Sequence, residues 1–350
     1  MKFTKLVKDI KSTNLSVSVT LQFNEQCYTI KSNDPALITA LKSYFKEWLS
    51  DNTKQATATI TAWQCETPDF DLDYTEYRET PEKRIKEAFA EIDNFRIVKK
   101  IKTGVHFAIG DNEWMAFGPL TTYPNQLINF VNAIFMEVNL HGNAFLFHAA
   151  GVAKNNEGIV IAAQSGKGKS TTSLFLVNAG LDFISNDRVI LQKENKDFTM
   201  IGVPKHPRVN PGTLLNNAQI SHLLKEPERF EGKSEEEIWN WEEKYDVVIP
   251  DIYGKEKFKL SAKAKAFLII DWGEDDSPLR LEKINLATRP DLLPEIMKKP
   301  SLMTPHIHAL KKDCSAQDYL NFIDGLPVYI LKGKINPQEG IALILQQFFQ

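Results

Sequence analysis

The sequence predicts an α/β fold in two parts, a mixed α/β domain at 1–120 followed by a second α/β domain at 121–350. Strand-like alternation and helical spacing are interleaved along the first part of the chain. In the second part, a short apolar run at 158–163 leads through a glycine-rich loop into an amphipathic stretch that ends at Gly180. A strand, a loop and a helix in this order are typical of an α/β domain, and 350 residues suffice for two cores.

The elements of the first part follow from its periodicity. Apolar and polar residues alternate where strands are expected, and apolar residues recur every three or four positions where helices are expected. Asp34 before Pro35 is a typical helix start. The expected elements are a hairpin over 15–31, a helix over 34–49, a strand over 56–63, a helix over 80–92, strands at 105–110 and 113–118, and a strong helix over 124–140 that leads into the second domain.

Composition excludes several classes of protein. The chain is 43% hydrophobic and 25% charged with a net charge of -3, which shows no bias towards nucleic acid or anionic membranes. No apolar run is long enough to span a bilayer, and the first residues lack the apolar segment of a signal peptide. Three widely spaced cysteines have neither metal-ligand nor redox spacing. We therefore expect a soluble, cytoplasmic protein without nucleic-acid or membrane partners.

The glycine-rich loop lies in IVIAAQSGKGKSTTSLFLVNAG, residues 159–180. Small residues allow successive backbone N–H groups to face phosphate oxygens, while Lys169 reaches the β- and γ-phosphates and Ser170 binds Mg²⁺. Ala163 stands where the Walker A pattern begins with glycine, and this costs little if its φ is negative. The alternative is a turn that binds nothing. The predicted nucleotide-binding residues are Ser165, Gly166, Lys167, Gly168, Lys169, Ser170 and Thr171.

Two polar residues flank this loop along the chain. Asp187 ends the apolar strand that follows the loop helix, where a carboxylate can bind Mg²⁺ or accept a proton from an attacking hydroxyl; it could equally cap a turn. His148 ends the strand AFLF, which precedes the strand that leads into the loop, and the expected hairpin brings it towards the phosphates. A single histidine is, however, more often packed or hydrogen-bonded than catalytic.

Further charged residues fit phosphoryl transfer. The loop 202–215 carries Lys205, His206 and Arg208 and no acid, so it can stabilise charge on a transferring phosphoryl group, or it can be an ordinary basic surface loop. Asp271 ends a third apolar strand, as in a Walker B strand, and could bind metal or face water. Lys263 or Lys265 before that strand could also reach phosphate.

The stretch EGKSEEEIWNWEEKYD at 231–246 is strongly acidic. A solvated helical face is the simpler interpretation of this pattern. The alternative is a surface that holds a basic partner.

These motifs together resemble a known family. FHAAGV, SGKGKST and SNDRV occur in the order found in the catalytic domain of the HPr kinase/phosphorylases. The chain resembles the HPr-kinase-related kinases more closely, including the B-type kinase of the GAK peptide system. This likeness rests on four stretches taken together, YPNQLINFVNAIFME, HAAGV, LDFISNDRV and GVPKHPRVNPGTLL. The resemblance covers about residues 120–275 and leaves out the amino-terminal domain. It implies a P-loop kinase domain of the HPr kinase / phosphoenolpyruvate carboxykinase-like type that uses ATP and Mg²⁺.

The resemblance also implies roles for individual residues. The family's active-site histidine falls on His148, its loop lysine on Lys169, its Mg²⁺-binding hydroxyl on Ser170 and its proton acceptor on Asp187. Asn186 replaces the first aspartate of the family's pair, and Thr171 replaces a glutamate. The family's second metal ligand is a glutamate without a clear counterpart here, and Asp271 could take that role. The family's oligomers suggest a homo-oligomer.

Three functions are compatible with these residues. The first is an ATP-dependent kinase with Asp187, His148, Lys169 and Arg208 as catalytic residues, Lys205 on the nucleotide, and Ser170, Asp187 and Asp271 at the metal. Its acceptor is a serine or threonine of a peptide or small protein, or a small-molecule hydroxyl. The second is an ATP-binding regulatory module without phosphotransfer. The third, a carboxykinase-like enzyme, is disfavoured because no lysine-and-histidine Mn²⁺ site has the required spacing.

Overall fold

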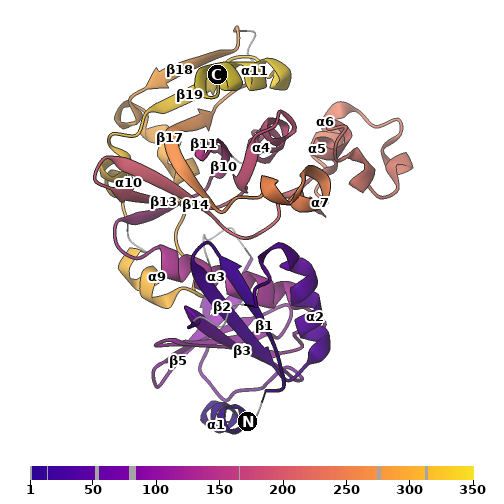
Figure 1. The fold of residues 1–350 in the computed structure, drawn as a ribbon, viewed down its shortest axis with the longest axis vertical. Coiled ribbons are helices and arrows are strands. Elements are labelled where there is room, and N and C mark those ends of the chain that lie inside the picture. Colours follow the sequence, from indigo (N-terminus) through magenta and orange to yellow (C-terminus); the bar gives the residue numbers. More distant parts are fainter. Residues whose placement is uncertain are drawn as a thin grey trace. The chain divides into compact units, whose positions relative to one another are not determined.

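The computed structural model describes residues 2–13, 15–51, 55–78, 84–164, 166–273, 277–311 and 314–350. The chain forms two units, each with a large β-sheet, so the predicted mixed α/β class is confirmed (Figure 1). The first unit comprises Met1–Val138 and Pro300–Lys312, and the second comprises Asn139–Lys299 and Asp313–Gln350. This division differs from the predicted boundary after residue 120, because the helix that follows packs on the first sheet.

The first unit is built on an eight-stranded sheet of the described residues, in the order β1-β2-β3-β8-β7-β6-β5-β4. The expected hairpin over 15–31 is confirmed, since β1 and β2 pair antiparallel with Phe23 opposite Gln26. Its strands are β1 (Val17–Phe23), β2 (Gln26–Ser32), β3 (Ala58–Gln64), β4 (Thr75–Tyr77), β5 (Glu87–Ile92), β6 (Phe95–Lys100), β7 (His106–Gly110) and β8 (Glu113–Gly118). Its helices are α1 (Phe3–Ser12), α2 (Pro35–Tyr44), the 3-10 helix η1 (Lys46–Trp48), α3 (Pro124–Asn139) and α9 (Pro305–Lys311).

Helices cover both faces of this sheet. On one face, Phe3 of α1 packs edge-on against Phe95 and Phe117. On the other face, Phe130 of α3 stacks on Phe107 with ring centroids 4.4 Å apart. Successive strand residues point to opposite faces, so the alternation seen in the sequence produces this two-sided core. The apolar side of α3 therefore belongs to the first unit.

The helix predicted over 80–92 is wrong where the structure describes it. Residues 79–83 lie outside the described part, and Glu87–Ile92 form strand β5. Ala88 and Ala90 are buried on alternate positions, and a two-residue turn with Asp93 at φ 52° pairs Ile92 with Phe95. Asp and Asn tolerate positive φ in such hairpin turns, so the Asp-Asn pair was the missed signal. Pairing between strands overrides the helix propensity of this stretch.

The second unit contains a nine-stranded sheet of described residues, with the main order β12-β10-β11-β17-β14-β13-β9 and with β19 joining β17 to β18. Its strands are β9 (Ala144–Phe147), β10 (Ala150–Lys154), β11 (Glu157–Ala163), β12 (Asp182–Ser185), β13 (Val189–Glu194), β14 (Asp197–Gly202), β17 (Ser261–Ile270), β18 (Arg280–Ile284) and β19 (Val328–Lys332), with a separate pair β15 (Arg208–Val209) and β16 (Tyr245–Asp246). Its α-helices are α4 (Lys169–Asn178), α5 (Pro211–Leu215), α6 (Glu235–Trp239), α7 (Ile249–Tyr253), α8 (Leu293–Ile296), α10 (Ala316–Ile323) and α11 (Pro337–Phe348). Its 3-10 helices are η2 (Ser221–Leu223), η3 (Pro227–Phe230), η4 (Lys255–Lys257), η5 (Leu286–Thr288) and η6 (Pro290–Leu292).

Three parallel strands organise the centre of this sheet. β17 pairs parallel with β11 on one side and with β19 on the other. Helix α4 lies against β10, β11 and β12, while α8 and α10 pack on Phe147 and Phe267 in the core on the opposite face. Loops that follow parallel strands emerge at the same edge of a sheet, and ligands of open α/β sheets bind at that edge. The glycine-rich loop after β11 and Asp271 after β17 therefore share one edge.

No helix among the residues described is both long enough and apolar enough to cross a membrane.

Candidate functional site

The glycine-rich loop joins β11 directly to α4. Gly166 and Gly168 have φ angles of 81° and 87°, a region that disfavours side chains, so both positions require glycine. Ala163 is the last residue of β11, where an extended backbone accepts alanine without strain. A side chain at Gly166 would contact nothing within 4 Å, so open space lies beside the loop. Ser165 lies outside the described residues.

Lys169 begins α4 and is almost enclosed. Its side chain is 10% exposed, and Nζ is buried without a hydrogen bond to any described residue. Burial lowers the pKa of Lys169, the charge of Asp187 raises it and the charge of Lys298 lowers it, and together these effects place the pKa at about 8. A buried ammonium with three donors and no hydrogen-bond acceptor fits a site built to receive anionic oxygens.

Asp187 is the carboxylate closest to this lysine. Its Oδ1 lies 3.2 Å from Nε2 of His148 and 3.7 Å from Nζ of Lys169, and its Oδ2 lies 3.8 Å from Nε of Arg188. Partial desolvation by the surrounding protein favours a raised pKa of Asp187, but the His148 hydrogen bond and the charges of Lys169 and Arg188 outweigh it, so the pKa is well below its usual range. The side chain is 61% exposed, so the carboxylate remains accessible to a reacting group.

The turn that carries Asp187 is fixed by Ser185. The Ser185 hydroxyl donates to the carbonyl of Arg188 at 2.6 Å and accepts from the backbone N–H of Val203 at 3.3 Å. This one buried hydroxyl therefore links the Asp187 turn to the start of the basic loop at 202–215.

His148 reaches Asp187 by a different route from the expected hairpin. β9 and β10 do not pair with each other; β9 pairs with β13, and β10 lies between β11 and β12. In the β9–β13 ladder Phe147 is opposite Val189, so His148, one residue further on, lies beside the turn that holds Asp187. The backbone N–H of His148 donates to the carbonyl of Ile296 at 2.9 Å, which holds the residue in place.

The basic loop contributes its cations unequally. The pKa of Lys205 is lowered, chiefly by burial and then by the charges of Arg188 and Arg208, whereas Asp187 and Asp246 raise it. Lys205 thus belongs to the charged group around Asp187. Arg208 is half exposed and pairs with Asp246 at 3.2 Å across β15 and β16. His206 is buried and packs edge-on against Phe258, which indicates a structural role.

Thr171 connects the loop helix to the same basic segment. Its hydroxyl lies 2.8 Å from that of Thr213 in α5, and both side chains are buried. The predicted role of Thr171 on the nucleotide is thus limited to its backbone N–H in the first turn of α4, because its hydroxyl is engaged with Thr213.

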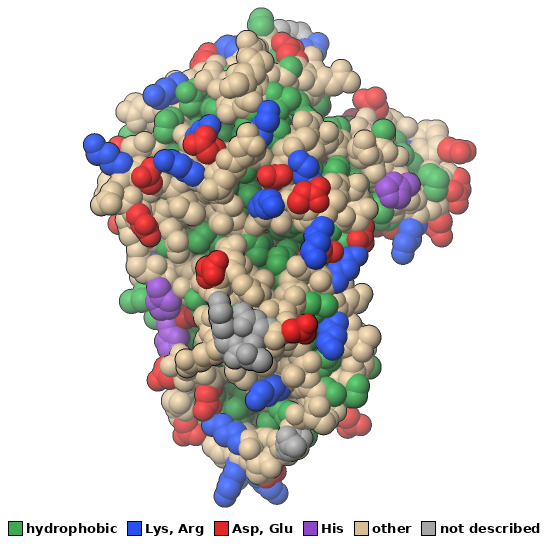
Figure 2. Space-filling view, viewed as in Figure 1, with side chains coloured by type: hydrophobic (Ala, Val, Ile, Leu, Met, Phe, Trp, Pro, Cys, Tyr) green, Lys and Arg blue, Asp and Glu red, His purple; other side chains and the backbone are tan. Residues whose placement is uncertain are grey.

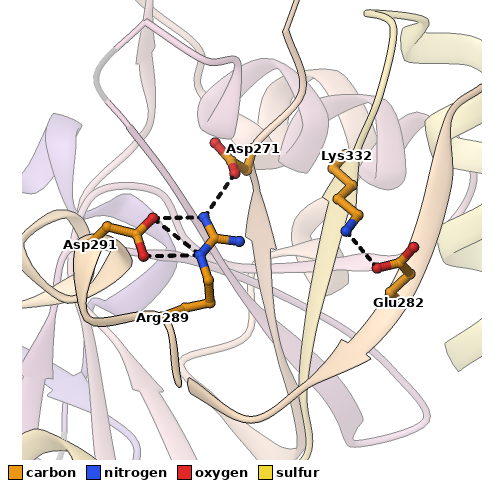
Figure 3. A network of polar contacts seen from close by, with 5 residues as sticks. All are labelled: Asp271, Glu282, Arg289, Asp291 and Lys332. Atoms are coloured by element: carbon orange, nitrogen blue, oxygen red, sulfur yellow. Dashed lines mark hydrogen bonds and ion pairs between the residues drawn. The ribbon is translucent and has the colours of Figure 1, made fainter. Parts of the chain in front are cut away.

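Asp271 follows β17 at the edge of the sheet where the loop lies. Its Oδ2 lies 3.4 Å from the guanidinium of Arg289, which also binds Asp291 at 2.6 Å (Figure 3). The predicted metal role of Asp271 thus competes with an ion pair. The next residue, Trp272, donates from Nε1 to the carbonyl of Lys167 at 3.0 Å and lies 3.3 Å from a side chain built at Gly168. Trp272 therefore supports the loop.

The structure assembles residues that the sequence pattern did not indicate. Lys298 follows α8 and acts electrostatically on Lys169, and Trp272 and Thr213 hold the loop and its helix. Lys298 and Trp272 lie in no local motif, and Thr213 lies in GVPKHPRVNPGTLL without a predicted role, since each acts through a contact between distant segments. The proposed contribution of Lys263 and Lys265 to phosphate is wrong. They pair with Asp197 and Glu157 at 2.6 Å each, near the opposite end of β17 from the loop.

The charges of the site suit a polyphosphate. Lys169, Arg188 and Lys205 act electrostatically on Asp187, and Lys298 acts on Lys169, so an anionic ligand would relieve repulsion among the cations. Among the described residues, no group of three or more His, Cys, Asp or Glu side chains is placed to hold a metal ion. A magnesium ion here would need phosphate oxygens and water besides Ser170 and Asp187, as is usual for Mg²⁺ with nucleotides.

Comparisons with known proteins show a likeness to a solved structure but none to a known sequence family. No protein-family model and no curated protein matches the sequence. Among solved structures, the chain is similar to the HPr(Ser) kinase/phosphatase from Coxiella burnetii, with 13% sequence identity and a TM-score of 0.31. The match covers 57% of this chain and 94% of that one. At this identity and score, the likeness does not indicate the function of the chain.

Proposed function

We propose that this chain is an ATP-dependent kinase that transfers the γ-phosphoryl group to a serine or threonine hydroxyl of a peptide or small protein. The observation that carries the proposal is the position of Asp187. An exposed carboxylate lies 3.7 Å from the buried lysine of a glycine-rich loop and 3.2 Å from a histidine. This combination suits phosphoryl transfer, because the cations bind the phosphates and the carboxylate orients the attacking hydroxyl.

Each residue has a defined part in this proposal. Backbone N–H groups of 166–171 and the ammonium of Lys169 bind the phosphates, and Ser170 and Asp187 hold Mg²⁺, which neutralises phosphate charge when bound. Asp187 orients the acceptor hydroxyl and takes its proton as the oxygen–phosphorus bond forms and the bond to the leaving ADP oxygen breaks. Lys205 and Arg188 stabilise the charge that develops on the transferring group. His148 holds the Asp187 carboxylate.

A second candidate is an ATP-binding regulatory module without phosphotransfer. The observation that favours it is the lowered pKa of Asp187, because a weakly basic carboxylate is a poor proton acceptor. Asn186 beside it carries no charge, and its buried Oδ1 makes no hydrogen bond among the described residues. In this case MgATP binds the loop and the carboxylate serves only to hold it.

The test uses purified protein, ATP labelled with radioactive phosphorus at the γ position, and a lysate of the protein's own source. A kinase transfers label to an acceptor, and separation by size shows whether that acceptor is a polypeptide or a small molecule. Lys169→Ala should abolish both nucleotide binding and labelling, whereas Lys265→Ala, which removes a lysine paired with Glu157, should leave both intact. MgATP binding without any labelled acceptor would overturn the kinase proposal in favour of the regulatory module.

A further inference from the structure

A groove lies in the segment from α5 to β16 of the second unit. Figure 1 shows α5 and α6 side by side, with the chain between them extending outward as loops and 3-10 helices. The groove has a volume of about 330 Å³ and runs between α5, η3 and α6. Its lining residues are Leu215, Asn216, Pro227, Phe230, Glu231, Glu235, Ile238 and Trp239.

The floor of this groove is apolar and partly open to solvent. Trp239 and Leu215 are each 39% exposed although both are large apolar residues. Trp239 is not loosely held, since a side chain built at Gly212 of α5 would approach its ring to 2.6 Å. The absence of a side chain at Gly212 therefore lets the indole lie close against α5. A fixed, half-exposed tryptophan in a concave surface is typical of a protein-binding site.

The rim of the groove is acidic. Residues 216–246 contain nine acidic side chains and four basic ones, which gives this segment a net charge of -5. Arg229 is taken up by Glu226 and Glu243 at 3.5 and 3.4 Å, and Lys233 lies over the ring of Trp241. Glu231 and Glu235, which line the groove, form no ion pair with any described residue. Figure 2 shows acidic side chains gathered over the outer end of this segment.

The groove is coupled to the candidate site through α5. This short helix continues the basic loop that carries Lys205 and Arg208, and its Thr213 shares a hydrogen bond with Thr171 in the first turn of α4. The two regions have opposite charge, because cations surround Asp187 while glutamates surround Trp239. A basic segment is therefore attracted to the groove and repelled from the phosphate site, which gives one orientation to a bound polypeptide.

We propose that this groove docks a basic segment of the acceptor polypeptide. An apolar side chain of that segment packs on Trp239 and Leu215, and flanking lysine or arginine residues pair with Glu231 and Glu235. This inference rests on the proposed kinase function for the identity of the bound polypeptide. It narrows the acceptor to a polypeptide that carries an apolar residue within a basic stretch, at a distance in sequence from the hydroxyl that receives the phosphoryl group.

The binding test uses a short fluorescein-labelled peptide with a central phenylalanine between lysines and arginines, titrated with the full chain and followed by fluorescence anisotropy. Two comparison peptides carry alanine in the centre or glutamates at the flanks. We expect Trp239→Ala to weaken binding of the basic peptide about tenfold or more, since buried aromatic anchors dominate such interfaces. Glu231→Gln with Glu235→Gln should weaken it about threefold to tenfold at low salt, and much less at high salt.

A matched control is Glu228→Gln with Glu242→Gln, two exposed glutamates of the same segment that do not line the groove. It should change peptide affinity less than the groove variant does. If both double variants weaken peptide binding equally, the effect comes from overall charge and the docking site is refuted. Equal binding of the basic and glutamate-flanked peptides would also overturn it.

Measurements of the nucleotide separate this inference from the kinase proposal. The groove variants should bind MgATP like the unaltered chain, and Lys169→Ala should still bind the basic peptide. If the groove variants label an acceptor from the lysate as fast as the unaltered chain, docking is refuted while the kinase proposal stands. If the peptide binds through Trp239 but no acceptor is ever labelled, the groove stands as a peptide-binding site and the kinase proposal fails.

Discussion

Nε2 of His148 lies 3.2 Å from Oδ1 of Asp187, although 38 positions separate the two residues along the chain. The pairing of β9 with β13 creates this contact, since it sets Phe147 opposite Val189 and leaves both residues at the adjoining strand ends. The same carboxylate oxygen also faces Lys169 at 3.7 Å.

Asp187→Asn should retain MgATP binding and lose phosphoryl transfer by about a hundredfold to ten-thousandfold, because an amide cannot accept the hydroxyl proton. Nucleotide affinity from calorimetry and label transfer from ATP measure the two effects separately. The matched control is Asp182→Asn, which removes another aspartate paired with a lysine, Lys257, away from the loop. Undiminished transfer by Asp187→Asn would refute the role of this carboxylate.

The affinity for MgATP should fall as pH rises above about 8. Burial lowers the pKa of Lys169 to about 8, and bound phosphate favours the ammonium form, so binding above this pH takes up a proton. Above pH 8 the affinity for MgATP should fall by up to about tenfold per pH unit, and below pH 8 it should not depend on this group. Calorimetry in buffers of different ionisation enthalpy detects the proton uptake. Lys169→Arg should lack this dependence, and an equal slope in that variant would assign the titration to another group.

The same shift has a consequence for stability in the absence of nucleotide. The unfolded chain binds the Lys169 proton more tightly than the folded chain, because the pKa of Lys169 is lowered on folding. The contribution of Lys169 to the free energy of unfolding therefore increases with pH, from about pH 8 up to the ordinary lysine pKa. Urea unfolding at several pH values, compared between the unaltered chain and Lys169→Met, isolates this contribution. A decrease over the same interval in that comparison would contradict the lowered pKa.

The Thr171–Thr213 hydrogen bond should contribute to folding and to the geometry of the loop. Thr171→Val leaves the buried Thr213 hydroxyl without its partner and should lower the free energy of unfolding by about 1–3 kcal/mol. The double variant with Thr213→Val should lose less than the sum of the two single variants, since no hydroxyl is then left unpaired. Urea denaturation of the four proteins measures the coupling. Strict additivity would show that the two hydroxyls do not interact in solution.

Trp272 should report nucleotide binding by its fluorescence. Its indole donates to the Lys167 carbonyl and lies against Gly168, so any adjustment of the loop changes its surroundings. Trp272→Phe should remove most of the emission change caused by MgATP and weaken nucleotide binding by about threefold to tenfold, as expected for one lost hydrogen bond. Trp241→Phe is the control, because that ring packs on Phe230 in the acidic segment. An emission change that survives in Trp272→Phe would contradict the expected coupling.

Lys298→Ala should raise the pKa of Lys169, because the charge of Lys298 lowers it in the folded chain. The pH above which MgATP affinity falls should therefore move upward, while the neighbouring variant Lys299→Ala should leave it unchanged. The same calorimetric pH series measures both variants. An unmoved profile in Lys298→Ala would show that this lysine does not act on the loop.

Local patterns in the sequence were sufficient to predict the helices and strands that build the site. The β1–β2 hairpin, the long helix α3, and the strand, loop and helix around Lys169 all follow from periodicity, capping and glycine positions, which act within a few residues. The extended Ala163 and the positive φ angles of Gly166 and Gly168 agree with the loop motif. By contrast, Glu87–Ile92 was predicted as helix and forms a strand, since its conformation depends on pairing with β6.

Residue types and local backbone geometry indicate which residues are candidates for binding phosphate and which carboxylate is a candidate for acting on a hydroxyl, because these properties belong to single side chains and short stretches of chain. Which of these residues meet depends on how distant segments pack. Strand pairing brings His148 to Asp187, sends Lys263 and Lys265 to the far end of the sheet, and gives Asp271 an arginine partner. Trp272 and Trp239 likewise acquire their contacts with Lys167 and Gly212 through segments remote in sequence. Such contacts depend on packing between distant parts of the chain, so local periodicity in the sequence does not predict them.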